Sequence, residues 1–242
     1  MGAAWLRSGA PKSTRVITAE REAEFGISPA LVTEVIEREQ PDIVILCSPN
    51  NPTGTPLSLE VIEAAYDATP GILLVDEAYA EFQEGDTALT LLAGRPRLLV
   101  SRTMSKAFAF AGARLGYLAA DPAAIDALRL VRLPYHLSAF TQAAAVAALS
   151  HAPAMLAMVE DIKAQRDRMI LALPELGYTP LPSEANFVLF GGVDDPQAVF
   201  RELLANDIII RDVGIPNHLR VTAGSDAETT LFLDALARIS AR

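Results

Sequence analysis

The sequence is poor in cysteine, in aromatic residues and in long apolar runs. Of its 242 residues only Cys47 is a cysteine, so the chain can form neither an intrachain disulfide nor a thiolate metal cage. A lone cysteine is typical of a reducing compartment, and we expect a cytoplasmic location. No uninterrupted apolar run approaches the roughly 18 residues of a membrane-spanning helix, and the run 3–6 is too short for the core of a signal peptide. We therefore expect no membrane segment and no export signal.

Basic residues are also scarce, because 20 Lys and Arg stand against 30 Asp and Glu and give a formal net charge of −10. Long-range attraction to nucleic acid or to an anionic membrane is therefore not expected. The net charge does not exclude local basic pockets. Apolar side chains are abundant, at 51%, and charged residues make up 21%. This composition excludes disordered, fibrous and low-complexity proteins and predicts a folded chain with a substantial core.

Hydrophobic periodicity divides the chain into two parts. Up to about residue 150, short β-branched runs alternate with helical patterns, which is typical of parallel strands joined by crossover helices. Because the runs lack polar alternation, we expect helices on both faces of the sheet. The expected strands are 43–47, 72–75, 98–101 and 115–119, and the expected helices are 29–40 and 58–68, with Ser28 and Ser58 as N-caps.

The second part begins with long helices rich in Ala and Leu and ends with short strands. We expect a partial ligand-binding large domain over residues 1–150, followed by a linking helix and a small α+β domain over 151–242. The expected helices are 122–132, 139–150, 153–173, 196–205 and a closing helix, and the expected strands are 178–181, 186–190, 208–211 and 219–222.

Two polar motifs directly follow predicted strands. The motif Ser-Pro-Asn-Asn-Pro-Thr-Gly at 48–54 lies at the carboxyl end of a strand, where open α/β sheets bind ligands, although every residue in it is also a common turn former. Asp76 ends the next strand, and Tyr79 follows three residues later. Asp76 is either a helix N-cap or a carboxylate aimed at a protonated ring nitrogen or a metal. No histidine cluster supports the metal, which leaves Mg²⁺ as a weaker option.

A third motif, 101–117, places Lys106 among small and apolar residues. Most lysines are solvated, but in an apolar cleft beside a cation the pKa of a lysine falls and its free amine can form a Schiff base. Thr103, Ser105 and Arg114 supply two hydroxyls and a forked cation, the groups that bind a phosphate monoester. Taken separately, these three residues fit a helix cap and a surface arginine equally well.

In combination, these motifs describe a site for pyridoxal 5'-phosphate (PLP): a lysine, an acid for a pyridinium nitrogen, an amide and a phenol for a ring oxygen, and a phosphate-binding group. From about Thr14 to the C-terminus the chain resembles fold-type I enzymes of the aspartate aminotransferase superfamily, and among them the histidinol-phosphate aminotransferase family. The resemblance implies an α/β fold with a mostly parallel sheet flanked by helices and a small α+β C-terminal domain. It also implies a homodimer and transamination in histidine biosynthesis.

The resemblance assigns a role to each residue of these motifs. Lys106 would be the Schiff-base lysine and proton carrier, and Asp76 would keep the ring nitrogen protonated. Asn51 and Tyr79 would donate hydrogen bonds to the phenolate oxygen of the ring. The cofactor phosphate would be held by Thr103, Ser105 and Arg114.

Two further arginines, Arg211 and Arg220, occur in strand-like contexts in the C-terminal part. Either could be an exposed cation at a sheet edge. The resemblance instead places both near the phosphate of histidinol phosphate and near the carboxylate of glutamate or 2-oxoglutarate, since histidinol phosphate has no α-carboxylate. No metal is expected. The role of Asn186 stays open, and no role is assigned to the three histidines.

The sequence also departs from the family. The resemblance implies that an N-terminal third is missing, with its entry arm, a tyrosine that reaches across the dimer, a phosphate loop and an aromatic residue that stacks on the cofactor. We therefore expect exposed apolar sheet faces and weakened PLP affinity. Alternative functions are an aromatic amino-acid aminotransferase, a decarboxylase of a phosphothreonine-like substrate, or an inactive aminotransferase-like domain that only binds a partner.

Overall fold

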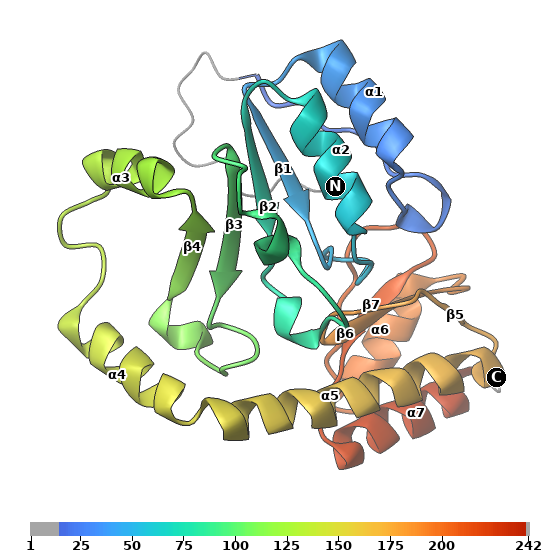
Figure 1. Ribbon diagram of the computed structural model, residues 1–242. Helices are drawn as coiled ribbons and strands as arrows, with labels where there is room; N and C mark the ends of the chain where they lie inside the picture. The colour runs from blue at the N-terminus through green and yellow to red at the C-terminus, as the bar shows by residue number, and fades with distance from the viewer. Residues whose placement is uncertain (1–14, 241–242) are drawn as a thin grey trace.

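The computed structural model describes residues 15–240, which form two β-sheets joined by one long helix (Figure 1). In the four-stranded sheet the strands are adjacent in chain order, and the first three are parallel. The expected α/β class with a mostly parallel sheet is therefore confirmed. The strands are β1 (Ile43–Cys47), β2 (Ile72–Asp76), β3 (Leu98–Thr103) and β4 (Gly116–Ala120).

The fourth strand corrects the expectation of parallel strands, because β4 runs antiparallel to β3, with Thr103 opposite Gly116. The connection 104–115 contains one 3-10 turn, η5 (Ala111–Ala113), and no α-helix. A parallel return needs a longer crossover, usually a helix, so this connection closes as a hairpin instead. The connection from β2 to β3 likewise carries the short turns η3 (Ala80–Phe82) and η4 (Ala88–Leu91) rather than a crossover helix.

Helices occur close to their predicted ranges. Ser28 caps the first helix, since its Oγ accepts a hydrogen bond from Leu31 N at 3.2 Å, whereas Ser58 occupies an N-cap position without such a bond. The helices are α1 (Pro29–Glu39), α2 (Leu59–Ala68), α3 (Pro122–Val131), α4 (Ala139–Ser150), α5 (Ala152–Ala172), α6 (Pro196–Leu204) and α7 (Asp226–Ser240). Two further 3-10 turns are η2 (Ala23–Phe25) and η6 (Leu173–Leu176).

The three-stranded sheet is antiparallel, with the order β5 (Thr179–Pro180), β6 (Phe187–Gly191) and β7 (Leu219–Thr222). The predicted strand 208–211 is wrong, because only Arg211 pairs with β7, through an isolated bridge to Arg220. Just before this segment, Asp207 has a left-handed φ of 61° and Ile208 N bonds back to Leu203 O at 3.0 Å. The chain thus reaches β7 only at the end of the predicted strand.

Along β1 and β2 the four-stranded sheet is covered on one face only. Leu73 and Val75 of β2 pack in a core with α1 and α2. The side chains that alternate with them point to the other face, where Ile43, Ile45 and Ile72 are 57%, 43% and 40% exposed. The prediction of helices on both faces is therefore wrong for β1 and β2, and the prediction of exposed apolar sheet faces is confirmed.

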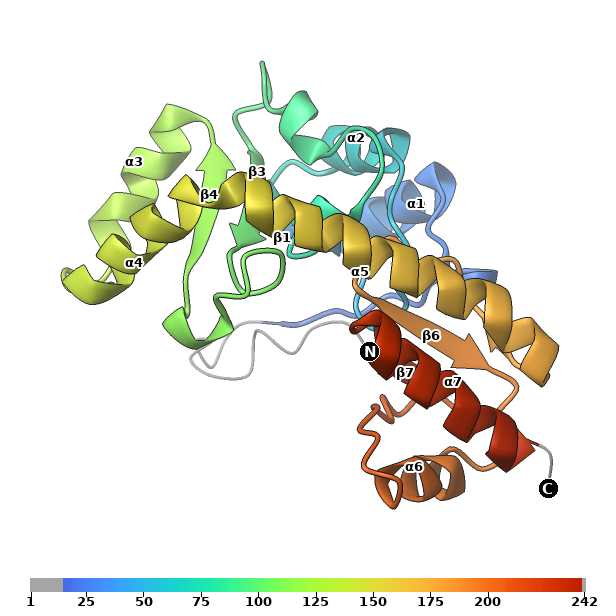
Figure 2. The same cartoon turned by 90° about the horizontal axis from the view of Figure 1, so that it is seen from below.

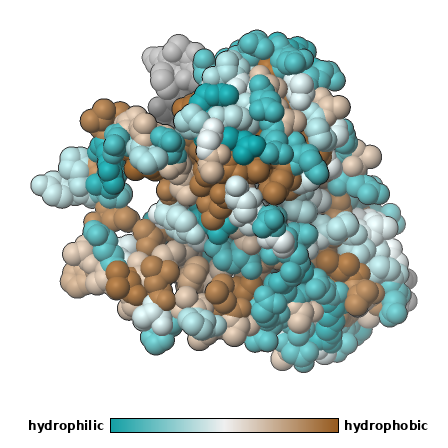
Figure 3. Space-filling view, viewed as in Figure 1, coloured by the Kyte–Doolittle hydropathy of each residue, from teal (hydrophilic) through white to brown (hydrophobic). Residues whose placement is uncertain are grey.

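Large apolar side chains are also exposed on α3 and α4, among them Val131 and Phe140. Apolar residues gather where α4 lies, at the lower left of Figure 3. Within residues 15–240 no single helix is long and apolar enough to cross a membrane. In the same range, one pair of consecutive helical segments, Ala139–Ser150 and Ala152–Leu176, has the length and apolar composition of a spanning segment when taken together, but the pair is bent by 74°.

Helix α5 links the two sheets. It runs from the end of α4 past the four-stranded sheet to the strands and helices of the C-terminal part (Figure 2). Its Met169 belongs to the core around the three-stranded sheet, together with Phe190 and Leu236. Earlier in the helix, Val159 belongs to a small separate core with Tyr79, and residues of both sheet regions contribute to that core.

Candidate active site

The loop 48–54 follows β1 and is closed by its own backbone. Asn50 N donates to Thr55 O at 2.8 Å, and Gly54 N donates to Asn50 O at 2.7 Å. Gly54 has a φ of +79°, and a Cβ added there would lie 2.1 Å from Ser183 Oγ, so glycine is needed both for the turn and for the close approach of the C-terminal part. The loop thereby holds Asn51 at the carboxyl end of the sheet.

Asp76 lies at the same edge, at the end of β2 and beside β3. Ser101 Oγ donates to its Oδ1 at 3.2 Å. Burial raises the pKa of Asp76, while the hydrogen bonds from Ser101 and from the Ala78 backbone oppose this rise. The N-cap interpretation is not supported, since η3 begins four residues later with Tyr79 in the N-cap position.

A buried ion pair lies behind Asp76. Glu77 is 1% exposed, and its Oε2 accepts hydrogen bonds from Arg102 Nε and Nη2 at 2.9 and 2.7 Å. Its Oε1 accepts from Ala88 N at 2.6 Å. Since side chains alternate along a strand, this pair faces away from Asp76 and joins the ends of β2 and β3 from the opposite face.

Tyr79 and Lys106 lie close together. The Lys106 Nζ is 5.4 Å from the centroid of the Tyr79 ring. Burial lowers the pKa of Lys106, and three nearby guanidinium groups lower it further, those of Arg220, Arg211 and Arg114. Burial raises the pKa of Tyr79, whereas the Arg220 charge opposes that change. Lys106 is itself solvent-exposed, so its amine stays accessible to a ligand while its pKa is lowered, beside a phenol whose pKa is raised.

The expected phosphate-binding residues are partly assembled. Thr103 Oγ1 donates to Ser105 Oγ at 2.9 Å and accepts from Ser105 N at 3.1 Å, so the two hydroxyls form one cluster after β3. Arg114 is exposed, has a left-handed φ of 54°, and donates to Ala111 O at 3.0 Å. Its charge still acts on Lys106. The hairpin 104–115 thus brings the two hydroxyls and the lysine together, while the guanidinium of Arg114 turns to its own loop.

Arg220 connects the C-terminal part to this edge of the sheet. Its Nη1 donates to Asn51 Oδ1, and Asn51 Nδ2 in turn lies 3.5 Å from the Tyr79 hydroxyl. Arg220 Nε is buried without a hydrogen-bond partner among the described residues. Arg211 pairs with Arg220 through two backbone hydrogen bonds of 2.9 Å, so the two cations are neighbours. An anion is the ligand that such a pair favours.

Two residues at the site, Phe187 and Cys47, were missed by the sequence analysis. Phe187 packs edge to face on Tyr79 with the ring centroids 5.2 Å apart, and the Arg220 guanidinium lies 4.6 Å from its centroid. Burial raises the pKa of the Cys47 thiol to about 11, with Asp76 adding to this rise and Arg21 opposing it. Cys47 is the last residue of an apolar strand, and Phe187 acts through a long-range aromatic contact, so neither belongs to a motif. Phe187 does lie in a strand that was predicted.

The remaining candidates have simpler surroundings. The backbone oxygen of Asn186 accepts a hydrogen bond from Ala223 N at 2.9 Å. Within residues 15–240 no group of three His, Cys, Asp or Glu side chains is placed to bind a metal ion. The arrangement at the sheet edge combines a reactive amine, an acid, two hydroxyls and several guanidinium groups, which suits a ligand that carries both a basic ring and an anionic group.

Comparison with known proteins identifies the family. Residues 10–236 match the family described as "Aminotransferase class I and II". The chain belongs to this family. The "Histidinol-phosphate aminotransferase" of Paenarthrobacter aurescens (strain TC1) is 56% identical over 228 residues, 92% of this chain and 61% of the relative. A second protein of that description, from Frankia casuarinae, is 54% identical over 232 residues, 93% of this chain and 58% of the relative.

A solved structure extends this similarity to the aminotransferase fold. The crystal structure of histidinol-phosphate aminotransferase from Sinorhizobium meliloti in complex with pyridoxal-5'-phosphate gives a TM-score of 0.84 at 28% identity, over 94% of this chain and 64% of that one. The resemblance noted in the sequence is thus confirmed. The chain spans about three fifths of the length of the two curated relatives, at 61% and 58%.

Proposed function

We propose that this chain is the larger part of a PLP-dependent aminotransferase that moves an amino group between histidinol phosphate and 2-oxoglutarate or glutamate. The single observation that carries the proposal is the position of Lys106. Its amine lies 5.4 Å from the Tyr79 ring, and its pKa is lowered by burial and by Arg220, Arg211 and Arg114. A neutral lysine amine is the form that reacts with a carbonyl.

The residues at the sheet edge fit PLP in chemistry and in placement. Asp76 would bind the ring nitrogen, because a half-buried carboxylate with a raised pKa gains from a cationic partner. Asn51 and Tyr79 would bind the ring oxygen, since their polar groups already face each other at 3.5 Å. The hydroxyls of Thr103 and Ser105 and the cation of Arg114 would bind the phosphate. Bound PLP supplies an electron sink for bonds at the carbon that carries the amino group.

The side chains of this chain would then handle protons and charge. Lys106 Nζ releases its proton more readily than an ordinary lysine because its pKa is lowered, and so it can act as the proton carrier. Burial raises the pKa of Tyr79, so this residue donates a hydrogen bond as a neutral phenol. Phe187 keeps water from one side of that ring, since Phe187 is itself buried.

The substrate phosphate would be bound by Arg220 and Arg211. Two adjacent guanidinium groups match a dianion, and Arg220 Nε, which has no hydrogen-bond partner within residues 15–240, offers a donor. Histidinol phosphate has no α-carboxylate, so its phosphate is the anion available to this pair. The carboxylate of glutamate would use the same cations in the other half of the reaction. A substrate without an anionic group would leave both cations unsatisfied.

The proposal extends to the whole protein. We propose the homodimer and the cytoplasmic location expected for this family of biosynthetic enzymes, and a boundary near residue 150 between a partial large domain and the linking helix with the small domain. The two relatives described as histidinol-phosphate aminotransferases support this choice of reaction over the aromatic amino-acid alternative.

An absorbance titration of the purified chain with PLP, beside Lys106→Ala, tests the proposal. We expect a near-visible band that the Lys106→Ala variant lacks, and then conversion of histidinol phosphate in preference to phenylalanine with 2-oxoglutarate as acceptor. The absence of a Lys106-dependent band would rule out an aminotransferase activity of this chain by itself and favour the partner-binding alternative. Equal use of phenylalanine would rule out the substrate assignment.

A further inference from the structure

One arginine of helix α5 bonds to both sheet regions at once. Arg166 is 5% exposed, and its Nη1 donates to Phe82 O at 3.2 Å and to Ala185 O at 3.5 Å. Phe82 ends the turn η3 after β2, and Ala185 precedes β6 in the C-terminal part. The Arg166 Nε donates to Asp167 Oδ1 at 2.7 Å, which balances the charge. A single buried guanidinium therefore ties together segments far apart in the sequence.

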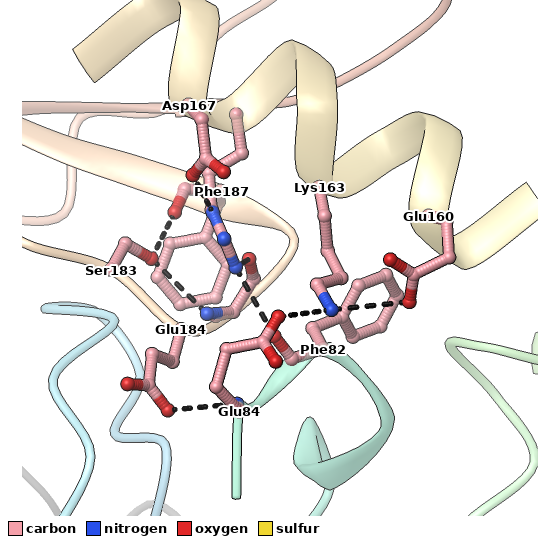
Figure 4. Close-up of polar contacts among 10 residues, drawn as sticks. Phe82, Glu84, Glu160, Lys163, Asp167, Ser183, Glu184 and Phe187 are labelled. Atoms are coloured by element: carbon pink, nitrogen blue, oxygen red, sulfur yellow. Dashed lines mark hydrogen bonds and ion pairs between the residues drawn. The ribbon is translucent and has the colours of Figure 1, made fainter. Parts of the chain in front are cut away.

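Ion pairs nearby hold the same three segments on the solvent side. Lys163, one turn before Arg166, pairs with Glu84 and, at 3.1 Å, with Glu160. The backbone N of Glu84 donates to Glu184 Oε2 at 3.3 Å. Figure 4 shows these contacts between the helix, the segment after η3 and the loop before β6. Because Glu84 is exposed, we expect these pairs to add little and the buried contacts of Arg166 to dominate.

The two carbonyls that Arg166 binds lie close in sequence to two aromatic rings of the site. Tyr79 is the N-cap of η3, and Phe187 is the first residue of β6. The rings meet at an interplanar angle of 88°, and both belong to a small core that includes Val159 of α5. Val159 and Arg166 are seven residues apart, so they share one face of the helix. The helix face that carries Arg166 thus also packs against the ring pair.

We propose that Arg166 is a positioning residue, which fixes the Tyr79 ring against Phe187 by holding the backbone on either side of that contact. Phe187 also lies under the Arg220 guanidinium. Arg166 therefore fixes the position of Arg220, which would bind the substrate anion, relative to Tyr79, which would bind the cofactor. This inference rests on the proposed function, which assigns Tyr79 and Arg220 to ligands. An arginine that only stabilised the helix would leave the ring contact unchanged.

The test compares two substitutions on the same helix. Arg166→Met removes the guanidinium and keeps a side chain of similar length. The control is Arg168→Met. Among the described residues outside α5, the Arg168 guanidinium donates to α7 alone, to Asp226 Oδ1 at 3.0 Å and to Thr230 Oγ1 at 2.8 Å. If Arg166→Met does not fold, Arg166→Lys replaces it, since lysine keeps the charge but lacks the planar fork that serves several acceptors.

The first readout needs no cofactor. In the chain labelled on its Tyr and Phe rings, NMR should show a nuclear Overhauser effect between Tyr79 and Phe187 and ring-current shifts of both. We expect Arg166→Met to lose these signals and Arg168→Met to keep them. Retention of the signals in Arg166→Met, or their equal loss in both variants, would overturn the positioning role.

The second readout uses the chain loaded with PLP. We expect Arg166→Met to lower kcat/KM for histidinol phosphate by about 10- to 100-fold, the scale on which a misplacement of about 1 Å costs rate. Because Phe187 lies under the Arg220 guanidinium, most of this change should appear as a higher KM. The KM should stay near the original value in Arg168→Met. If the unmodified chain shows no Lys106-dependent band, the proposed function fails, while the ring signals still decide whether Arg166 positions Tyr79.

Discussion

Removal of the Arg102 guanidinium tests how the ends of β2 and β3 are held together. In Arg102→Met the Glu77 carboxylate, 1% exposed, would lose the bonds of 2.9 and 2.7 Å from Arg102 and keep only the one from Ala88 N. Breaking a buried ion pair by removing one partner costs about 3–5 kcal/mol, because the other charge stays buried. We expect a loss of this size in the free energy of unfolding, measured by urea denaturation followed by circular dichroism.

Two comparisons separate the ion pair from general packing. The double variant Glu77→Gln with Arg102→Met should regain most of the loss, since a neutral amide still accepts from Ala88 N and needs no cation. The control Arg95→Met breaks a pair of 2.6 Å whose partner Glu63 is 42% exposed, and should cost about 0–1 kcal/mol.

The reasoning would be refuted by either of two results. The first is that Arg102→Met proves no less stable than Arg95→Met, in which case the buried carboxylate finds another partner or water. The second is that the double variant is as unstable as the single one, which would assign the loss to the packing of the Arg102 stem.

Two further predictions concern Gly54 and the lysines. Gly54→Ala should cost about 2–4 kcal/mol from a left-handed backbone and overpacking against Ser183, while Gly94→Ala, at a φ of +74° in open space, should cost about 1–2 kcal/mol in the same urea assay. Equal losses would contradict the close approach. Acetylation of Lys106, followed by mass spectrometry, should become fast at a lower pH than that of Lys163, since burial lowers the pKa of Lys106 whereas a hydrogen bond to a carboxylate raises that of Lys163. A shared midpoint would count against the lowered pKa.

Much of the fold was predictable because short apolar runs and clear helix starts are local signals. The observed β1, β7 and α4 have the predicted bounds. The direction of β4 was not predictable in this way, since an apolar run has the same composition whether it pairs parallel or antiparallel. The segment 208–211 shows the same limit, because its isoleucines fit a strand while its backbone leaves α6 in a left-handed turn.

The same distinction between local signals and long-range contacts applies to the candidate site. Asp76, Lys106 and the hydroxyls of Thr103 and Ser105 stand in compact motifs, and the structure places them at one sheet edge. Phe187 and Arg166 were missed, because their importance comes from contacts between segments far apart in the chain. In the sequence Arg166 cannot be distinguished from an ordinary helical arginine, because its carbonyl partners belong to distant segments.

Helix α5 also limits where residues can be inserted into or deleted from this chain. Val159 packs with the Tyr79 core, and Met169 packs with the core of the three-stranded sheet. Ten residues of helix, about 15 Å, therefore fix the position of one core relative to the other. One inserted residue would turn the later part by about 100° and move every following side chain off its partner. Insertions and deletions should therefore be absent from this stretch in related chains, and confined to loops such as 212–218.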